Sequence, residues 1–261
     1  LMMKYVYHYP YFIASLSAVL LVAFLYLRYA VPIYRVTSTL LIKDEKGGGR
    51  GGPNEDLESI VFSKQSINLD NEIEILHSYS LVSRVVERLR LYMSYYSEGK
   101  IRRSEVYTTS PVELVPLIYY DSLAEFDLEI RFKDSSTFQM GNKLYSLNQP
   151  IAFEWGKAMI VRRTGTPMDL SYKYIITKRY PSLVTQDIIA KLKIAPINTR
   201  STVLKLELEA ENEQRGADIL NMLNEEYDET NVEDKNKILQ KTILFIDDRL
   251  NIVGRELGNE E

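Results

Sequence analysis

Few residues in this 261-residue chain have side chains suited to catalysis or metal binding. The chain has no cysteine, which excludes a cysteine nucleophile, a thiolate metal site and a disulfide scaffold. It has two histidines, His8 and His77, too few for a histidine-rich metal site. No second ligand lies within reach of His77 by sequence spacing, so we expect it to be a partly packed or exposed structural residue.

Two further patterns could suggest binding chemistry. The glycine-rich segment KDEKGGGRGGPNED, residues 43–56, lacks the Lys-Ser or Lys-Thr pair that a phosphate-binding loop needs, and it reads as a flexible surface loop. Asp247 and Asp248 are adjacent carboxylates, but neighbouring residues on a helix diverge by ~100°, which favours a solvated face. The sequence therefore predicts no catalytic, cofactor-binding or metal-binding residue in this chain.

The most informative element lies near the N-terminus. The 23 residues between Lys4 and Arg28, YVYHYPYFIASLSAVLLVAFLYL, contain no acidic or strongly basic side chain. A helix of this length reaches ~35 Å, enough to cross a bilayer, and tyrosines at both ends suit the two interfaces. We predict a transmembrane helix over residues 9–29. The apolar residues assigned to the span are Phe12, Ile13, Leu16, Leu20, Leu21, Phe24 and Leu25.

The alternatives to a span are a buried core helix and a cleaved signal peptide. The apolar run is longer than the ~7–15 residues of a signal peptide, and it ends in LYLRYAVPIY rather than in a small-residue cleavage site. Lys4 stands on one side, whereas Arg28, Arg35 and Lys43 follow on the other. The positive-inside rule therefore does not by itself indicate a cytoplasmic N-terminus.

The middle of the chain predicts an α+β domain. FDLEIRF, residues 126–132, alternates strictly, so Phe126, Leu128, Ile130 and Phe132 can face a core. Further strands are expected at YRVTSTLLI, PVELVPLIYY, KLYSL, AMIVRR, SYKYII, KIAP and STVLKLELE. Helices are expected at NEIEILHSYSLVSRVVERLRL, with an Asn71–Glu74 capping box and a possible break at Ser78 and Ser80, and at PSLVTQDIIAKL, with Ser182 as N-cap.

From Asn212 to Glu261 the chain predicts one long helix, or two with a joint in DETNVEDKNK. Apolar residues in its second half recur at heptad spacing, namely Leu239, Ile243, Ile246, Leu250, Val253 and Leu257. Burying them yields roughly 9–18 kcal/mol, less than the ~28 kcal/mol needed to order the segment. This seam therefore needs a partner: the same domain, a second helix, or a neighbouring subunit.

The C-terminal part of the chain is more acidic than the rest. Residues 211–261 carry 6 basic and 14 acidic side chains, whereas the preceding residues carry 26 basic and 22 acidic ones. Neither part has the clustered basic stripe of a nucleic-acid binder, so no nucleic-acid partner is expected.

The order of these segments resembles the polysaccharide co-polymerase, or chain-length determinant (Wzz-like), family of bacterial envelopes. It is most similar to the branch fused to a cytoplasmic tyrosine autokinase. The resemblance covers nearly the whole chain. The segments that carry it are PIYRVTSTLLIKDE, NEIEILHSYSLVSRVVERLRL, STVLKLELEAENEQRGADILNMLNEEY and KTILFIDDRLNIVGREL.

The resemblance implies a cytoplasmic N-terminus (residues 1–8), an inner-membrane span (9–29), a membrane-proximal periplasmic α/β domain (30–211) and a truncated, coiled-coil-like helix (212–261). It implies ring-like homo-oligomers that regulate the length or export of O-antigen, capsule or exopolysaccharide. The implied partners are membrane lipid, further copies of the chain, the polymerase or export machinery and, as a further candidate, the nascent glycan. No active-site residue transfers. ATP and Mg²⁺ are expected only if a kinase domain follows in the parent protein, and a first residue of Leu suggests a fragment.

Three other functions compete with a scaffold. A sensor would join an extracytoplasmic ligand domain to a signalling helix. A periplasmic adaptor of an efflux or secretion system normally places its helical hairpin between two halves of a β domain, whereas here the long helix follows the sheet. A soluble enzyme is disfavoured by the span and by the lack of a recognisable nucleophile, base and orienter.

Overall fold

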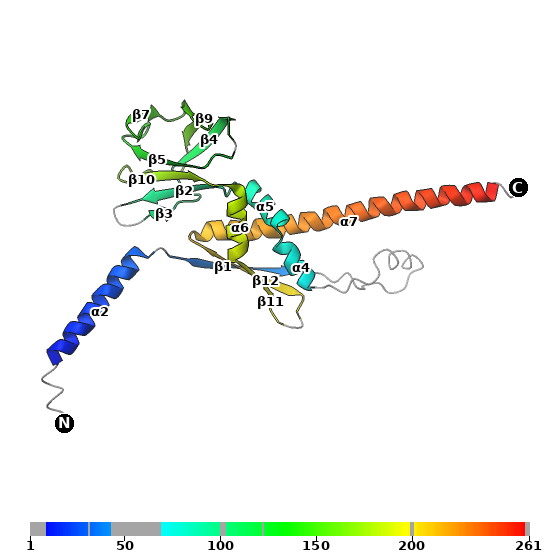
Figure 1. The fold of residues 1–261 in the computed structure, drawn as a ribbon, viewed down its shortest axis with the longest axis horizontal. Helices are drawn as coiled ribbons and strands as arrows, with labels where there is room; N and C mark the ends of the chain where they lie inside the picture. Colours follow the sequence, from blue (N-terminus) through cyan, green and yellow to red (C-terminus); the bar gives the residue numbers. More distant parts are fainter. Residues whose placement is uncertain are drawn as a thin grey trace, which may run out of the picture. The chain divides into compact units, whose positions relative to one another are not determined.

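A computed structural model describes residues 9–30, 32–42, 69–99, 103–121, 123–198 and 201–258, of which residues 10, 29 and 251–258 are described by their backbone alone (Figure 1). The chain forms two compact units. Unit 1 comprises residues 1–34, 93–180 and 210–214, and unit 2 comprises residues 35–92, 181–209 and 215–261. The expected α/β domain of residues 30–211 thus contributes to both units. Residues 1–8, including His8 and Lys4, and the glycine-rich segment 43–56 lie outside the described residues.

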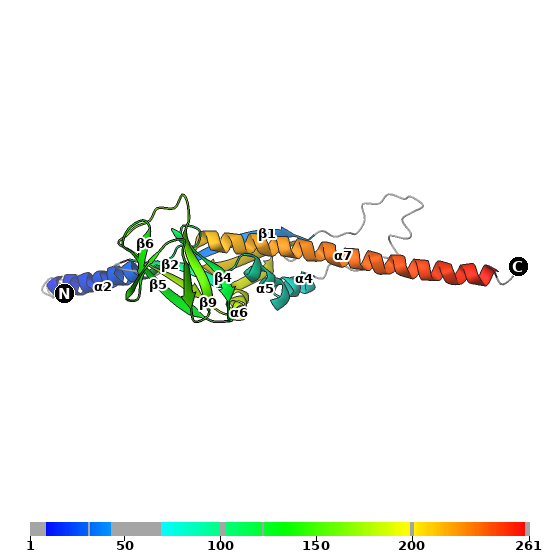
Figure 2. The ribbon, with the colours of Figure 1, turned by 90° about the horizontal axis from the view of Figure 1, so that it is seen from above.

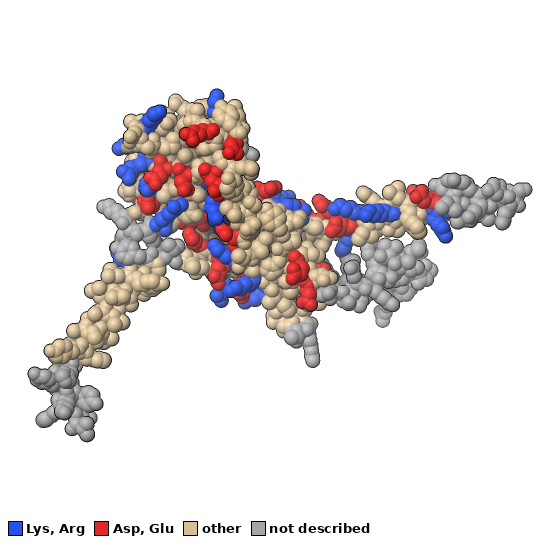
Figure 3. Space-filling view, viewed as in Figure 1, with Lys and Arg blue, Asp and Glu red and all other residues tan. Residues whose placement is uncertain are grey.

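Helix α2, Tyr9–Tyr29, occupies the predicted apolar segment. Its window Tyr11–Arg28 has a mean hydropathy of 1.9 and is the one candidate membrane span among the described residues. A signal sequence satisfies the same length and composition test. The visible side of α2 carries no charged side chain over most of its length (Figure 3).

Unit 1 is built from two antiparallel sheets. The larger has the order β3-β2-β10-β5-β6-β7 and the smaller the order β4-β9-β8. The strands of the larger sheet are β2 (Met93–Glu98), β3 (Arg103–Glu105), β5 (Phe126–Phe132), β6 (Thr137–Met140), β7 (Lys143–Ser146) and β10 (Lys173–Lys178). Those of the smaller are β4 (Val112–Tyr119), β8 (Pro150–Phe153) and β9 (Gly156–Arg162).

The core of unit 1 lies between these two sheets. Ile130 and Ile176 of the larger sheet and Ile160 of the smaller are completely buried in one cluster. The Leu114 N–H donates a hydrogen bond of 3.2 Å to the Tyr95 hydroxyl, which joins the sheets directly. The expected alternation of FDLEIRF is confirmed, because its apolar residues are half-buried or buried and its charged residues are exposed. Alternation thus fixes which face of β5 meets the core.

Trp155 closes the same core at the hairpin between β8 and β9. Its ring is stacked between Phe126, at a centroid distance of 4.3 Å, and Phe153, at 4.7 Å. The next residue must be glycine, because a Cβ atom at Gly156 would lie 2.1 Å from the carbonyl oxygen of Ile118. The close approach of β4 and β9 therefore depends on the missing side chain.

Unit 2 combines a three-stranded sheet with helices. The sheet has the order β1-β12-β11, with β1 at Tyr34–Leu41, β11 at Leu192–Pro196 and β12 at Val203–Ala210. The helices are α4 (Leu69–Leu76), α5 (Tyr79–Arg88), α6 (Pro181–Lys191) and α7 (Glu213–Gly258), and α5 packs on α6. Along β12, Leu204, Leu206 and Leu208 are buried, as their alternation predicts.

The helix boundaries confirm one expectation and correct two. Ser78 interrupts the helical segment at the predicted place and caps α5, since its side chain accepts a hydrogen bond from the Leu81 N–H. The Asn71–Glu74 capping box is wrong, because α4 begins earlier, at Leu69. Ser182 is not an N-cap, because α6 already begins at Pro181, whose missing N–H and fixed φ suit the first helical position.

Helix α7 has 46 residues and no joint in DETNVEDKNK. It runs without a break in two perpendicular views (Figures 1 and 2). The residues buried along its first half are Gly216, Ile219, Leu220, Leu223, Glu226 and Tyr227. This half therefore belongs to the core of unit 2.

Candidate functional site

The second half of α7 carries an apolar stripe that nothing in the described part of the chain covers. The seam residues with described side chains are Leu239, Ile243, Ile246 and Leu250, and they are between 42% and 65% exposed. The side chains of Val253 and Leu257 lie outside the described residues. Within the described chain, the same-domain partner considered for these four residues is therefore absent.

The helical geometry places these residues on one narrow face. At ~100° per residue, Leu239, Ile243, Ile246 and Leu250 fall within an arc of about 60°. Val232, which is 58% exposed, lies on the same arc one heptad earlier. The predicted seam did not include Val232, because the polar Asn236 occupies the heptad position between Val232 and Leu239. A single Asn at such a position can set the register of a coiled coil.

The rest of this helix surface carries charged side chains and three exposed apolar ones, Ile238, Leu244 and Phe245. Acidic and basic side chains alternate along the visible side of α7 beyond its buried half (Figure 3). Lys237 and Asp234 form an exposed ion pair of 3.2 Å. Asp247 and Asp248 are both exposed on this helix. Apolar residues that recur at heptad spacing on one arc are typical of a helix that pairs with another helix.

A charged cluster anchors the base of α7 to α5 within unit 2. The side chain of Glu226 is only 3% exposed, and its carboxylate accepts a 2.6 Å hydrogen bond from Arg88. Arg84 lies 3.3 Å from the other carboxylate oxygen, without an aligned hydrogen bond. Arg88 also reaches Glu229 at 3.1 Å. Buried charge held by two guanidinium groups fixes the position of α7 on α5.

Further polar contacts fix the same part of α7. The Tyr227 hydroxyl donates a 2.6 Å hydrogen bond to Glu72 of α4, and Asn224 donates one of 3.0 Å to Ser38 of β1. Burial, followed by the hydrogen bond to Glu72, raises the pKa of Tyr227 above its usual range. Arg215 donates to the carbonyl oxygen of Leu91 at 2.9 Å. Unit 2 therefore holds the first half of α7 from several sides.

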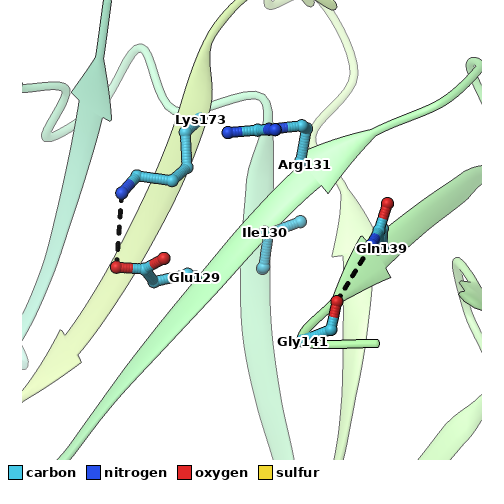
Figure 4. A pocket seen from close by; sticks show the side chains of 6 residues that line it. All are labelled: Glu129, Ile130, Arg131, Gln139, Gly141 and Lys173. Atoms are coloured by element: carbon cyan, nitrogen blue, oxygen red, sulfur yellow. Dashed lines mark hydrogen bonds and ion pairs between the residues drawn. The ribbon is translucent and has the colours of Figure 1, made fainter. Parts of the chain in front are cut away.

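A second candidate site is a pocket on the larger sheet of unit 1. The pocket has a volume of about 200 Å³ and is lined by Glu129, Ile130, Arg131, Gln139, Gly141 and Lys173 (Figure 4). Lys173 forms ion pairs with Glu98 at 2.5 Å and with Glu129 at 3.3 Å. The hydrogen bonds to Glu98 and then to Glu129 raise the pKa of Lys173, and the hydrogen bond from Lys173 lowers the pKa of Glu98. The ammonium group is therefore held charged and in place.

A larger pocket, of about 490 Å³, lies at the other end of strands β5 and β10. Its lining residues are Glu125, Phe126, Asp127, Thr177, Lys178 and Arg179. Lys178 is only 4% exposed, and its ammonium group donates a 2.8 Å hydrogen bond to the carbonyl oxygen of Ala124. Burial lowers the pKa of Lys178. Neither pocket was predicted from the sequence, because each depends on residues brought together by strand pairing.

The other residues discussed from the sequence are His77 and those assigned to the span. His77 is half-buried between α4 and α5, and its ring nitrogens lie 3.2 Å and 3.1 Å from the carbonyl oxygens of Ile73 and Leu192. Among the described residues, no group of three His, Cys, Asp or Glu side chains is placed to hold a metal ion. The residues assigned to the span lie on α2 and are between 42% and 67% exposed, namely Phe12, Ile13, Leu16, Leu20, Leu21, Phe24 and Leu25.

Comparison with known proteins gives one informative similarity. No family model matches the chain. Over 274 aligned residues the chain is 23% identical to a protein of Ralstonia solanacearum described as "Putative tyrosine-protein kinase EpsB". The alignment covers 94% of this chain and 36% of that protein. The chain thus spans little more than a third of the relative that it resembles along almost its whole length.

Proposed function

We propose that this chain is the membrane-anchored, extracytoplasmic part of a scaffold that assembles into homo-oligomers and regulates the chain length, polymerisation or export of a surface polysaccharide. The observation that carries the proposal is the uncovered seam of α7, on a helix whose base is fixed in unit 2. The resemblance to chain-length determinants and the similarity to the EpsB-named protein support the polysaccharide role. In this proposal α2 crosses the bacterial inner membrane, and unit 2 and the sheets of unit 1 lie in the periplasm.

The energetics favour assembly on a membrane. Burying the four described seam side chains gains about 6–12 kcal/mol per chain, against an association cost of roughly 4–15 kcal/mol. Anchoring by α2 holds the chains in one plane and raises their effective concentration. Oligomers should therefore form when both the membrane helix and the seam are present.

The proposed partners follow from this arrangement. Lipid surrounds α2, further copies of the chain cover the seam, and the polysaccharide polymerase or export machinery is organised around the assembly. ATP and Mg²⁺ are expected ligands of the parent protein only if it carries a kinase domain.

The test compares Leu250→Asp with Leu244→Asp. Both leucines lie on α7 and are 65% exposed, but Leu244 points about 130° away from the seam. We expect Leu250→Asp to disrupt the oligomer, measured by light scattering of the detergent-solubilised protein, and to alter glycan length on gels of surface polysaccharide. Leu244→Asp should change neither. An intact oligomer and unchanged glycan with well-expressed Leu250→Asp would refute the proposal, as would equal effects of the two variants.

A further inference from the structure

Helix α7 carries a second apolar row beside its seam. Ile238 and Phe245 are seven residues apart, so they lie on the same side of the helix, and they are 47% and 68% exposed. Thr242 lies between them, and its hydroxyl donates a 2.9 Å hydrogen bond to the carbonyl oxygen of Ile238. Because this bond satisfies the hydroxyl within the helix, Thr242 can enter an apolar contact at little cost. Ile238, Thr242 and Phe245 are called the second row below.

The second row follows the seam at a fixed offset. An apolar pair recurs every seven residues, with one member in the second row and the next residue in the seam. The pairs are Ile238–Leu239 and Phe245–Ile246, and the sequence continues the pattern with Ile252–Val253, whose side chains lie outside the described residues. Adjacent residues on a helix differ in height by only ~1.5 Å, and the centres of the two rows are about 120° apart. The helix therefore presents apolar side chains in two directions at the same heights.

A two-fold pairing of seams would leave the second row in water. In a two-stranded coiled coil each helix uses a single apolar face, which on α7 is the seam. Ile238 and Phe245 would stay exposed in such a dimer, because they point about 120° away from that face. In a heterologous contact the seam of one helix meets the second row of the next, so both rows are buried. The additional apolar burial favours the heterologous contact.

A common membrane anchor places the two rows in register. In the scaffold proposed above, every copy crosses the same bilayer through α2 in the same direction, so the copies are related by rotation about the membrane normal. Neighbouring α7 helices then run parallel, and residues with the same number lie at the same height. Phe245 of one copy is therefore level with Ile246 of the next copy, to within ~1.5 Å along the helix.

From these features we infer that α7 assembles heterologously, with the seam of each copy packed against the second row of its neighbour. The inference rests on the proposed homo-oligomer and names the surface that covers the seam within it. A helix with two contact faces has two neighbours, so the contact repeats until a ring closes. In a ring of four parallel helices the contact faces of each helix are about 90° apart, and this angle grows with the number of helices. The separation of about 120° therefore predicts more than four copies.

The test is disulfide cross-linking in membranes, for which the chain is suited because it has no cysteine of its own. The double variant Phe245→Cys/Ile246→Cys carries one thiol in each row. On oxidation we expect dimers, trimers and larger species on non-reducing gels, because each disulfide joins one seam to the next second row. Ile246→Cys alone should stay monomeric, since equivalent residues of neighbouring helices are separated by about 8–10 Å, beyond the ~7 Å between Cα atoms that a disulfide can bridge.

The matched control is Leu244→Cys/Phe245→Cys. It also carries two adjacent thiols at exposed positions of α7, but Leu244 lies about 110° from the second row and about 130° from the seam. The control should give no series of larger species. Circular dichroism verifies that each variant is folded. The inference is overturned if Phe245→Cys/Ile246→Cys forms nothing larger than a dimer, if Ile246→Cys alone forms dimers, or if the control cross-links equally.

A charged substitution in the second row separates this inference from the proposed function. Phe245→Asp should dissociate the oligomer as Leu250→Asp does, whereas Leu244→Asp should leave it intact. If Leu250→Asp dissociates the oligomer and Phe245→Asp does not, the scaffold stands and the second row is not its interface. If Phe245→Cys/Ile246→Cys forms the larger species but Leu250→Asp leaves glycan length unchanged, the interface stands and the polysaccharide role fails.

Discussion

Replacing Glu226 by Ala should loosen α7 from its base. The Glu226 side chain is 3% exposed and holds Arg84 and Arg88, whose side chains are 38% and 43% exposed. Removing one member of a fully buried ion pair typically costs about 3–5 kcal/mol, because a charge is left without compensation. Here both guanidinium groups can regain water and Arg88 keeps Glu229, so we expect a loss of about 2–3 kcal/mol.

This loss corresponds to a fall in Tm of roughly 5–10 °C for a protein of this size. Far-ultraviolet circular dichroism of the detergent-solubilised chain follows the helices, which include α4 to α7 of unit 2. Fluorescence of Trp155, the single tryptophan, follows unit 1 in the same sample. We expect the circular dichroism transition to shift more than the fluorescence transition.

Glu229→Ala is the matched control. Glu229 lies one turn further along α7 and also pairs with Arg88, but its side chain is 49% exposed. Such a surface pair contributes about 1 kcal/mol or less. If the two alanine variants lose the same stability within about 0.5 kcal/mol, burial of the Glu226 charge does not anchor α7 and the reasoning fails.

The other predictions concern unit 1. Trp155→Ala should destabilise it by about 3–5 kcal/mol, because the ring is buried between Phe126 and Phe153; a loss below about 1 kcal/mol in urea denaturation would contradict this packing. Asp134 accepts hydrogen bonds from Thr137 and Ser136, which lower its pKa, so its carboxylate stabilises the fold above the unfolded pKa of ~3.9 and that contribution disappears as pH falls toward the lower folded value. Asp134→Asn should therefore lose less stability between pH 5 and pH 2 than the wild type does, and parallel urea midpoints across that range would refute it.

Strong periodicity was sufficient to predict the long elements. The alternation of FDLEIRF and of Val203 to Leu208 yielded β5 and β12, and Ser78 marked the break between α4 and α5. Strands β3, β6 and β8 have three or four residues each, too few to show a period. Strand β2, MSYYSE, shows no apolar–polar alternation, because its core residue is Tyr95, which is flanked by a serine and a second tyrosine. Its buried face could therefore not be predicted.

The candidate sites also differ in whether the sequence alone could predict them. The seam of α7 is a local pattern on one helix, so its spacing is visible in the sequence. The ion pairs of Lys173 join residues from β2, β5 and β10, which are 31 to 75 positions apart, and only the strand register brings them together. Burial of Glu226 depends likewise on contacts with α5, more than 130 residues earlier in the chain. Charged residues in a helix otherwise indicate a solvated face.

An unbroken α7 also has a mechanical consequence. The part from Val232 to Gly258 corresponds to an arm of about 39 Å, and it contains no proline and a single glycine, Gly254, before its last residue. A tilt of about 5° at the fixed base would move the far end of such an arm by roughly 3 Å. Small changes in how unit 2 holds the helix would thus be magnified into displacements about as large as one side chain, enough to shift which seam residues of two neighbouring arms face each other.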